Sequence, residues 1–408
     1  MQPSDNVLSG VRVVELATVV FVPSSGTVMS DFGAEVIKIE PPGGGDLYRR
    51  FHELPGMPDS EIEYCWILDG RNKKSVVLDL KTPAGREAAY RLIATADVFT
   101  TSCHPSVLEK LGMTWEALRA KNPRLVYAHG TGFGTEGDEV EKPGYDMVCY
   151  WSRSGLEATM FPLQGELGPI TCGSGDHPTG MTLFGAIMMA LYRRERTGEG
   201  SYVSTSLLAN GAWSNSCMIE AQLCGAQFHA RRPRAEAINF TNLYYRPRDG
   251  RVFKLCIVDI AKNWAPFCAA IGRTSIAEDP RFAQLPDRLR NMRELIPLID
   301  AAFAEHDLAH WKQALEAAEI PYSVLQNYQE IAEDPQMWAN GVFAEMTHPV
   351  HGPLTVVSSP IAVGGQPKVE PRAAPGYGEH TRDVLAEIGY RDDEIRALCG
   401  DGVAVAAG

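Results

Sequence analysis

The chain has little positive charge for its length. Its 38 lysines and arginines stand against 51 acidic residues, which gives a formal net charge of −13. A protein that wraps nucleic acid or binds an anionic membrane needs a concentrated basic surface. The acidic balance therefore disfavours both classes, although it leaves room for a local basic pocket that holds a phosphorylated ligand.

Metal-binding and disulfide patterns are also missing. Nine cysteines are scattered from residue 65 to residue 399 without a CxxC pair, so no cysteine–histidine zinc motif is present. Structural zinc sites and disulfide frameworks depend on such spacings. We therefore expect no metal, no permanently bound cofactor, and a reducing cytoplasm as the compartment.

Long hydrophobic runs are scarce. The most apolar stretch, residues 180–192, is shorter than the roughly 20 residues that span a bilayer, and it predicts a buried helix. Residues 1–10 contain no basic region followed by an apolar run, so we expect no signal peptide. Both observations favour a cytoplasmic location.

Strands and helices alternate in the first part of the chain. With 408 residues, the chain exceeds the roughly 250 to 300 residues at which one hydrophobic core stops growing, so we expect two domains. A parallel sheet covered on both faces has this alternation, which predicts an α/β, Rossmann-like large domain. The predicted strands are residues 11–16, 35–40, 75–80, 97–101 and 125–129, and helices are expected within 24–34, 82–92 and 115–121.

After residue 225 the pattern changes to that of a smaller α+β domain. A turn signal runs into an apolar strand within residues 244–258, and helical periodicity then dominates. The predicted helices are residues 261–271, 289–305 and 308–318; short strands follow at 342–346 and 354–357, and helices at 381–388 and 392–398.

Asp176 lies in the segment GSGDHPTGM (173–181), directly before a long apolar helix that Gly198 ends. An aspartate in this place is typical of a helix N-cap, and that is the simplest interpretation. The same place permits a second role. A helix N-terminus keeps a carboxylate ionised, and an ionised, partly desolvated carboxylate is a candidate covalent nucleophile.

His177 is a candidate general base beside that carboxylate. A histidine directly before Pro178 is nevertheless more typical of a polar residue in a first helical turn. Residues 43–45 are three glycines after a strand, but they lack the GxGxxG spacing and a Walker A lysine, so a loop is the favoured interpretation.

Basic residues cluster near the expected strand ends. Cations at the carboxyl edge of an α/β sheet hold nucleotide phosphates, whereas the simpler interpretation is a solvated basic face. The set is Arg71, Lys73, Lys74, Lys81 and Lys110.

Taken together, several segments resemble the class III CoA-transferase family, which contains formyl-CoA transferase and α-methylacyl-CoA racemase. The resemblance covers essentially the whole chain, and the order and spacing of its segments are specific. The segments are GVRVVEL (10–16), DFGAEVIKIE (31–40), RNKKSVVLDLK (71–81), ALYRRERTGEG (190–200) and GEHT (378–381).

The resemblance implies a two-domain protomer. Residues 1–225 and the returning segment 326–408 would build the large Rossmann-like domain, and residues 226–325 the small α+β domain. Two chains would interlock into a homodimer with active sites between domains. The implied activity is that of a CoA-transferase, with a coenzyme A thioester and a carboxylic acid as substrates.

The resemblance also implies site residues and a mechanism. The family's catalytic aspartate falls on Asp176, which would form an aspartyl anhydride and then an aspartyl-CoA thioester. The positions that contact coenzyme A in the family fall on Val19, Leu78, Lys81, Ser102, Cys103, Lys110, Leu111 and Lys142.

The sequence departs from the family pattern at two places. Residues 101–103 are Thr-Ser-Cys where Glu-Asn-Phe is usual, and Val19-Val20-Phe21 stands where formyl-CoA transferase has a glutamine. An apolar neighbourhood of Val20, Phe21 and Tyr145, with Trp151 and Met160, favours an acid larger than oxalate, such as a branched, unsaturated or aryl-substituted one; a succinyl-CoA-type donor is compatible.

Three alternatives remain open. An acyl-CoA racemase on the same fold would use a histidine where this chain has Tyr145, and tyrosine is a weak base near neutral pH. A non-catalytic subunit of a hetero-oligomer is disfavoured by the retained Asp176. A nucleotide oxidoreductase is disfavoured by the missing GxGxxG motif after the first strand.

Overall fold

The computed structural model describes residues 6–160, 173–230 and 232–407, which group into two compact units. Unit 1 comprises the described residues of 6–160, 173–226 and 337–407, and unit 2 those of 227–336. The predicted domain bounds, at residues 225 and 325, stay a prediction.

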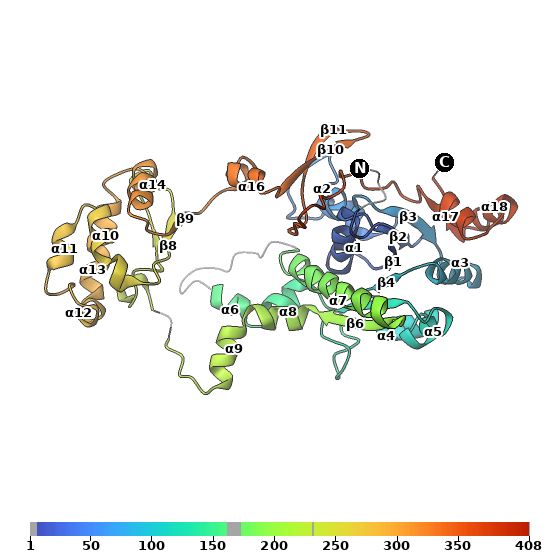
Figure 1. Ribbon diagram of the computed structural model, residues 1–408, viewed down its shortest axis with the longest axis horizontal. Coiled ribbons are helices and arrows are strands. Elements are labelled where there is room, and N and C mark those ends of the chain that lie inside the picture. The colour runs from blue at the N-terminus through green and yellow to red at the C-terminus, as the bar shows by residue number, and fades with distance from the viewer. Residues whose placement is uncertain (1–5, 161–172, 231, 408) are drawn as a thin grey trace. The chain divides into compact units, whose positions relative to one another are not determined.

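A seven-stranded sheet forms the centre of unit 1 (Figure 1). Its order is β12-β3-β2-β1-β4-β5-β6, and all neighbours are parallel except β12, which runs antiparallel to β3. The order reverses between β1 and β4, and ligands of open α/β sheets bind at the carboxyl ends of the strands at such a point. The strands are β1 (Arg12–Leu16), β2 (Glu35–Glu40), β3 (Lys74–Leu78), β4 (Val98–Thr101), β5 (Val126–Thr131), β6 (Ser201–Ser206) and β12 (Ala404–Val405).

Helices cover both faces of this sheet. Val13 and Val14 of β1 are neighbours, so their side chains point to opposite faces, and both are fully buried in separate core clusters. The helices of unit 1 before residue 227 are α1 (Phe21–Asp31), α2 (Tyr64–Gly70), α3 (Pro83–Ala94), α4 (Pro105–Leu111), α5 (Trp115–Lys121), α6 (Leu156–Met160), α7 (Asp176–Thr197), α8 (Leu207–Ser214) and α9 (Ser216–Leu223), with the 3₁₀ segment η2 (Leu47–Glu53) and the π segment η3 (Met147–Ser152).

The predicted parallel α/β sheet is confirmed, and all five predicted strands are present within two residues. Two strands were not predicted. β6 reads Ser-Tyr-Val-Ser-Thr-Ser at one edge of the sheet, where alternate residues are half-exposed and little apolar signal remains. β12 has only two residues at the opposite edge.

The C-terminal segment packs on unit 1 (Figure 1). The side chain of Thr381 accepts a hydrogen bond from the backbone N–H of Val77 at 3.0 Å, and Ser75 Oγ accepts one from Gly378 at 2.9 Å. The GEHT segment therefore joins the last part of the chain to β3. The elements here are α16 (Pro335–Ala339), which begins in unit 2, the hairpin of β10 (Phe343–His348) and β11 (Gly352–Val357), α17 (Thr381–Glu387) and α18 (Asp392–Gly400).

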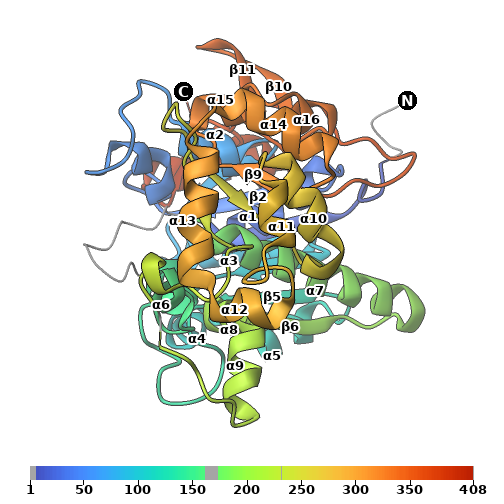
Figure 2. The same ribbon diagram turned by 90° about the vertical axis from the view of Figure 1, so that its left-hand side faces the viewer.

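Unit 2 is mainly helical (Figure 2), and it has its own small sheet and an aromatic core. Phe253, Phe303 and Trp311 are buried there, and the rings of Phe303 and Trp311 meet edge-on at 5.0 Å. The antiparallel sheet has the order β7-β8-β9, with β7 (Tyr244–Tyr245), β8 (Phe253–Leu255) and β9 (Tyr322–Val324). The helices are α10 (Ile260–Ala270), α11 (Thr274–Glu278), α12 (Leu285–Arg290), α13 (Met292–Phe303), α14 (Leu308–Ala317) and α15 (Tyr328–Ala332), with the 3₁₀ turn η4 (Arg234–Glu236).

Two helix predictions need correction. Residues 289–305 are not one helix, because Asn291 ends α12 and begins α13, and its side-chain amide donates to the carbonyl of Arg281 at 3.0 Å. Residues 180–192 are helical but not buried all round, since Met189 and Tyr192 are each about two thirds exposed in the single chain. None of the helices in the described part of the chain has the length and apolar character that a membrane crossing requires.

Candidate active site

Asp176 is the first residue of α7 and is almost completely buried. The N-cap of this helix is Gly175, so the predicted N-cap role of Asp176 is wrong by one position. Helix α7 lies against α1 with no room for a side chain at Gly180, where an added Cβ would stand 2.0 Å from Ser24 Oγ. This close packing fixes the start of α7 beside the loop that follows β1.

The turn before Asp176 is held by another carboxylate. Asp146 Oδ2 accepts a hydrogen bond from the N–H of Gly175 at 3.1 Å, and Oδ1 accepts one from Met147 at 2.8 Å. Gly175 packs directly on the ring of Tyr150, and an added Cβ would lie 2.7 Å from a ring carbon. Position 175 therefore has room only for glycine. Because Asp146 binds the N–H of Gly175, its carboxylate lies close to Asp176.

Burial changes the protonation of Asp176. Desolvation is the main cause that raises the pKa of Asp176 to about 7, and the neighbouring charge of Asp146 adds to it. His177 acts in the opposite direction, and Asp69 contributes a further small rise. The helix N-terminus, which favours the ionised carboxylate, is therefore opposed by burial and by two neighbouring carboxylates.

His177 is held at both ring nitrogens. Its Nδ1 lies 3.0 Å from the carbonyl oxygen of Gly173, and its Nε2 lies 3.2 Å from Oδ2 of Asp69, at the end of α2. Desolvation opposes the charged ring, but the Asp69 carboxylate outweighs it and raises the pKa of His177 to about 9. A histidine in this state has no free lone pair, so the general-base interpretation does not fit the geometry.

The loop after β1 carries an unusual backbone conformation. Val19 has a φ of 65°, in the left-handed region that a β-branched residue rarely occupies. Its N–H donates to both carboxylate oxygens of Asp46, at 3.1 and 3.2 Å. Such a conformation persists only where the surroundings impose it, and here the anchor is Asp46.

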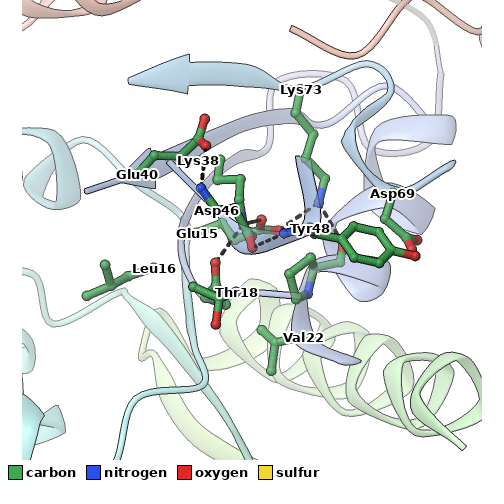
Figure 3. Close-up of polar contacts among 12 residues, drawn as sticks. Glu15, Leu16, Thr18, Val22, Lys38, Glu40, Asp46, Tyr48, Asp69 and Lys73 are labelled. Atoms are coloured by element: carbon green, nitrogen blue, oxygen red, sulfur yellow. Dashed lines mark hydrogen bonds and ion pairs between the residues drawn. The ribbon is translucent and has the colours of Figure 1, made fainter. Parts of the chain in front are cut away.

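A buried ionic network supports that anchor (Figure 3). Lys38 of β2 bridges Asp46 at 2.8 Å and Glu15 of β1 at 3.0 Å, and its Nζ also donates to the carbonyl of Ala17 at 2.6 Å. Lys73 pairs with the other oxygen of Glu15 at 2.9 Å. These four ionic side chains are nearly inaccessible to solvent, so the network links β1, β2 and the loop at Val19 inside the protein.

Three of the predicted coenzyme A contacts meet at the carboxyl ends of β1 and β4. Ser102 Oγ accepts a hydrogen bond from the N–H of Thr18 at 3.3 Å, which places Val19 near Ser102 and Cys103. Leu16 of β1 is paired with Thr101 of β4 directly before them. These residues lie where the strand order reverses, the position at which α/β sheets bind ligands.

The other predicted contacts occupy different surroundings. Leu78 ends β3 and is buried in the core, whereas Lys81, after the same strand, is exposed. Lys110 and Leu111 end α4. Lys142 is exposed and pairs with Glu139 at 3.2 Å.

The predicted acid-binding residues have different surroundings. Val20 and Phe21 are buried in two different core clusters, while Tyr145 is 65% exposed. A cavity of about 1440 Å³ with mainly apolar walls borders Asp69 and His177, and none of the three predicted residues lines it.

The predicted basic face needs correction. Arg71 is buried and forms a bidentate ion pair with Asp31, and the buried Lys73 forms an ion pair with Glu15. Lys74 begins β3, so it lies at the amino edge of the sheet, where it pairs with Glu35. Arg71 and Lys73 neutralise buried carboxylates, and Lys74 neutralises the partly exposed Glu35. Lys81 and Lys110 are the exposed members of the set.

Several residues that shape the site were not predicted. Asp69 and Asp146 approach Asp176 only through tertiary contacts, and Asp46 lies in an irregular loop. A signal did exist for Glu15 and Lys38. Strands of a parallel sheet read as nearly continuous apolar runs, so a charge inside VVEL or VIKIE indicates a buried ion pair.

Comparisons with known proteins agree on one family. The model of CoA-transferase family III matches residues 8–381. The chain is 31% identical over 407 residues to cinnamoyl-CoA:phenyllactate CoA-transferase of Clostridium sporogenes, covering 98% of this chain and 97% of that protein. It is 29% identical over 388 residues to (R)-2-hydroxy-4-methylpentanoate CoA-transferase of Clostridioides difficile, covering 95% and 97%. A crystal structure of a CaiB/BaiF family protein from Brucella suis has a TM-score of 0.81 at 27% identity, covering 94% of this chain and 99% of the other.

Proposed function

The chain belongs to CoA-transferase family III, and from this we propose that Asp176 is the covalent nucleophile of a coenzyme A transfer between two carboxylic acids. The observation that supports the assignment is the position of this carboxylate. It is buried at the first residue of α7, directly after Gly175 and next to His177 in the sequence. A desolvated carboxylate in a closed site can attack an activated acyl group that water does not reach.

The reaction then has two half-reactions. The Asp176 carboxylate attacks the donor thioester carbonyl, and a mixed anhydride forms as the coenzyme A thiolate leaves. The thiolate attacks the aspartyl carbonyl of that anhydride, which releases the donor acid and leaves an aspartyl-CoA thioester. The acceptor carboxylate attacks this thioester, and the thiolate released then attacks the acceptor carbonyl of the second anhydride. The products are the new acyl-CoA and the free Asp176 carboxylate.

Val19, Ser102 and Cys103 are proposed to contact coenzyme A. Their position at the carboxyl ends of β1 and β4 supports this, because that edge is where α/β sheets bind ligands. Leu78, Lys81, Lys110, Leu111 and Lys142 complete the proposed set.

The acceptor is proposed to be an acid with a branched or aryl-substituted side chain, larger than oxalate. Two relatives that match nearly the whole chain are named for such acids, phenyllactate and (R)-2-hydroxy-4-methylpentanoate. The chain also keeps apolar residues where formyl-CoA transferase has a glutamine. A homodimer is part of the same proposal.

The proposal is tested by incubating the protein with a panel of acyl-CoA donors, followed by hydroxylamine and intact-protein mass spectrometry. We expect a productive donor to leave a hydroxamate on the peptide that contains Asp176, and the native mass of the same preparation to be that of two chains. An α-proton exchanging with deuterium without any adduct would instead support a racemase. A protein that gains no adduct and binds no second copy would support a partner-dependent subunit.

A further inference from the structure

The hydrogen bonds of His177 determine its charge. A backbone carbonyl oxygen only accepts hydrogen bonds, so Nδ1, 3.0 Å from the carbonyl of Gly173, must carry a proton. An ionised carboxylate also only accepts, so Nε2, 3.2 Å from Asp69, must carry a proton as well. A ring that donates from both nitrogens is an imidazolium.

The charges around Asp69 favour its ionised form. Burial works against its charge, but His177, followed by Lys73 and Arg71, more than offsets it and holds the pKa of Asp69 below its usual value. Asp69 is 4% exposed, and Lys73 is in turn fixed by Glu15 in the buried network (Figure 3). The partner of His177 is therefore a fixed negative charge rather than a neutral acid.

The placement of His177 runs against the ordinary rules of helix stability. It is the second residue of α7, and a positive charge near a helix N-terminus is unfavourable because that end of the helix dipole is already positive. Features that oppose local stability are concentrated at functional sites. Here the carboxylate of Asp69 keeps the cation in a place where the helix alone would repel it.

The positive charge of His177 acts on the carboxylate of Asp176. Asp176 is buried beside the carboxylates of Asp146 and Asp69, and both disfavour its ionised form. Among the described charged groups that influence Asp176, the imidazolium of His177 is the one that favours the anion. The side chain of His177 is half-exposed and borders the apolar cavity, so the cation also stands close to space that is open to ligands.

We propose that His177 is an electrostatic positioning residue, whose charge is fixed by Asp69 and Gly173 and favours the ionised form of Asp176. The consequence for catalysis rests on the proposed function of Asp176, because only the ionised carboxylate can attack a thioester. The charge of His177 and the ionisation of Asp176 can be measured without any turnover.

The direct test is an NMR titration of the full chain, labelled with ¹⁵N-histidine and ¹³C-carboxyl aspartate. His177→Gln and Asp176→Asn spectra assign the two signals. We expect the His177 signal at pH 7.5 to show two protonated nitrogens, and the titration midpoint of Asp176 to rise by about 1 to 3 pH units in His177→Gln. His177→Lys, which keeps a cation, should raise the Asp176 midpoint less. A neutral His177 at pH 7.5, or an unchanged Asp176 midpoint in His177→Gln, would overturn the proposal.

A second experiment measures, as a function of pH, the rate at which the hydroxylamine-trapped adduct forms. Asp176 is reactive when deprotonated, so the wild-type rate should rise through about pH 7 and then level off. In His177→Gln the whole profile should move to higher pH, with a loss of about fivefold or more at pH 7. A uniform loss without a shift would mean a merely structural role for His177. If wild type forms no adduct at any pH, the proposed nucleophile fails, while the NMR midpoints still decide the charge relation.

Discussion

Asp176→Asn is expected to lower the rate of coenzyme A transfer by about 10⁴-fold or more. The amide has nearly the size and shape of the carboxylate, so the turn held by Asp146 and Gly175 should remain, but the amide oxygen is a poor nucleophile. Loss of a covalent nucleophile is among the largest effects a single substitution produces in an enzyme. Steady-state transfer from a productive donor to an acceptor acid measures the loss.

A matched control is Asp401→Asn, which makes the same chemical change at an exposed aspartate. It should leave the rate of transfer unchanged. Denaturation midpoints of both variants establish that the fold is retained. An Asp176→Asn enzyme with more than about a tenth of the wild-type rate would contradict the assignment of the nucleophile.

Lys38→Met is expected to destabilise the protein by about 3 to 5 kcal/mol. Lys38 is fully buried, and burial opposes its charge, but Asp46 and Glu15 raise its pKa above the usual value of a lysine. Removing the cation leaves Asp46 as a buried charge without its ion-pair partner, and leaves Glu15 with Lys73 alone. Breaking one partner of a buried ion pair costs this much because the other charge stays desolvated. Urea denaturation followed by circular dichroism gives the change in unfolding free energy.

The control here is Lys74→Met, the same substitution on the adjacent strand β3. Lys74 pairs with Glu35, but both side chains are about a third exposed, so solvent screens the pair. A loss of about 0 to 1 kcal/mol is expected. Equal losses for the two variants would show that the buried network does not stabilise the loop at Val19 as argued.

The architecture of the sheet could be predicted from sequence because its strands are apolar and separated by regular helices. The prediction for residues 35–40 coincides with β2, and the strand predicted at 75–80 is observed as β3 at 74–78. The sequence pattern did not predict strand β6, and the reason is physical. An edge strand that is half solvated does not need apolar residues, and its sequence resembles a polar loop.

The site was predictable only in part. Asp176 could be singled out from its glycine-rich context before a long helix, but its neighbours could not. Asp69 and Asp146 come from distant segments, and the raised pKa of Asp176 is a consequence of their approach and of burial. The charge of His177 depends on two hydrogen-bond acceptors, and no sequence pattern specifies either of them.

The central claim, a covalent role for Asp176, is tested most directly by oxygen transfer. A single turnover is run with the aspartyl-CoA thioester form of the protein and an acceptor acid labelled with ¹⁸O in its carboxylate. In the proposed mechanism the thiolate attacks the acceptor carbonyl of the anhydride, so the bridging oxygen stays on the enzyme. Peptide mass spectrometry should then find one ¹⁸O in the side chain of Asp176. Formation of the new acyl-CoA without label at Asp176 would contradict the account.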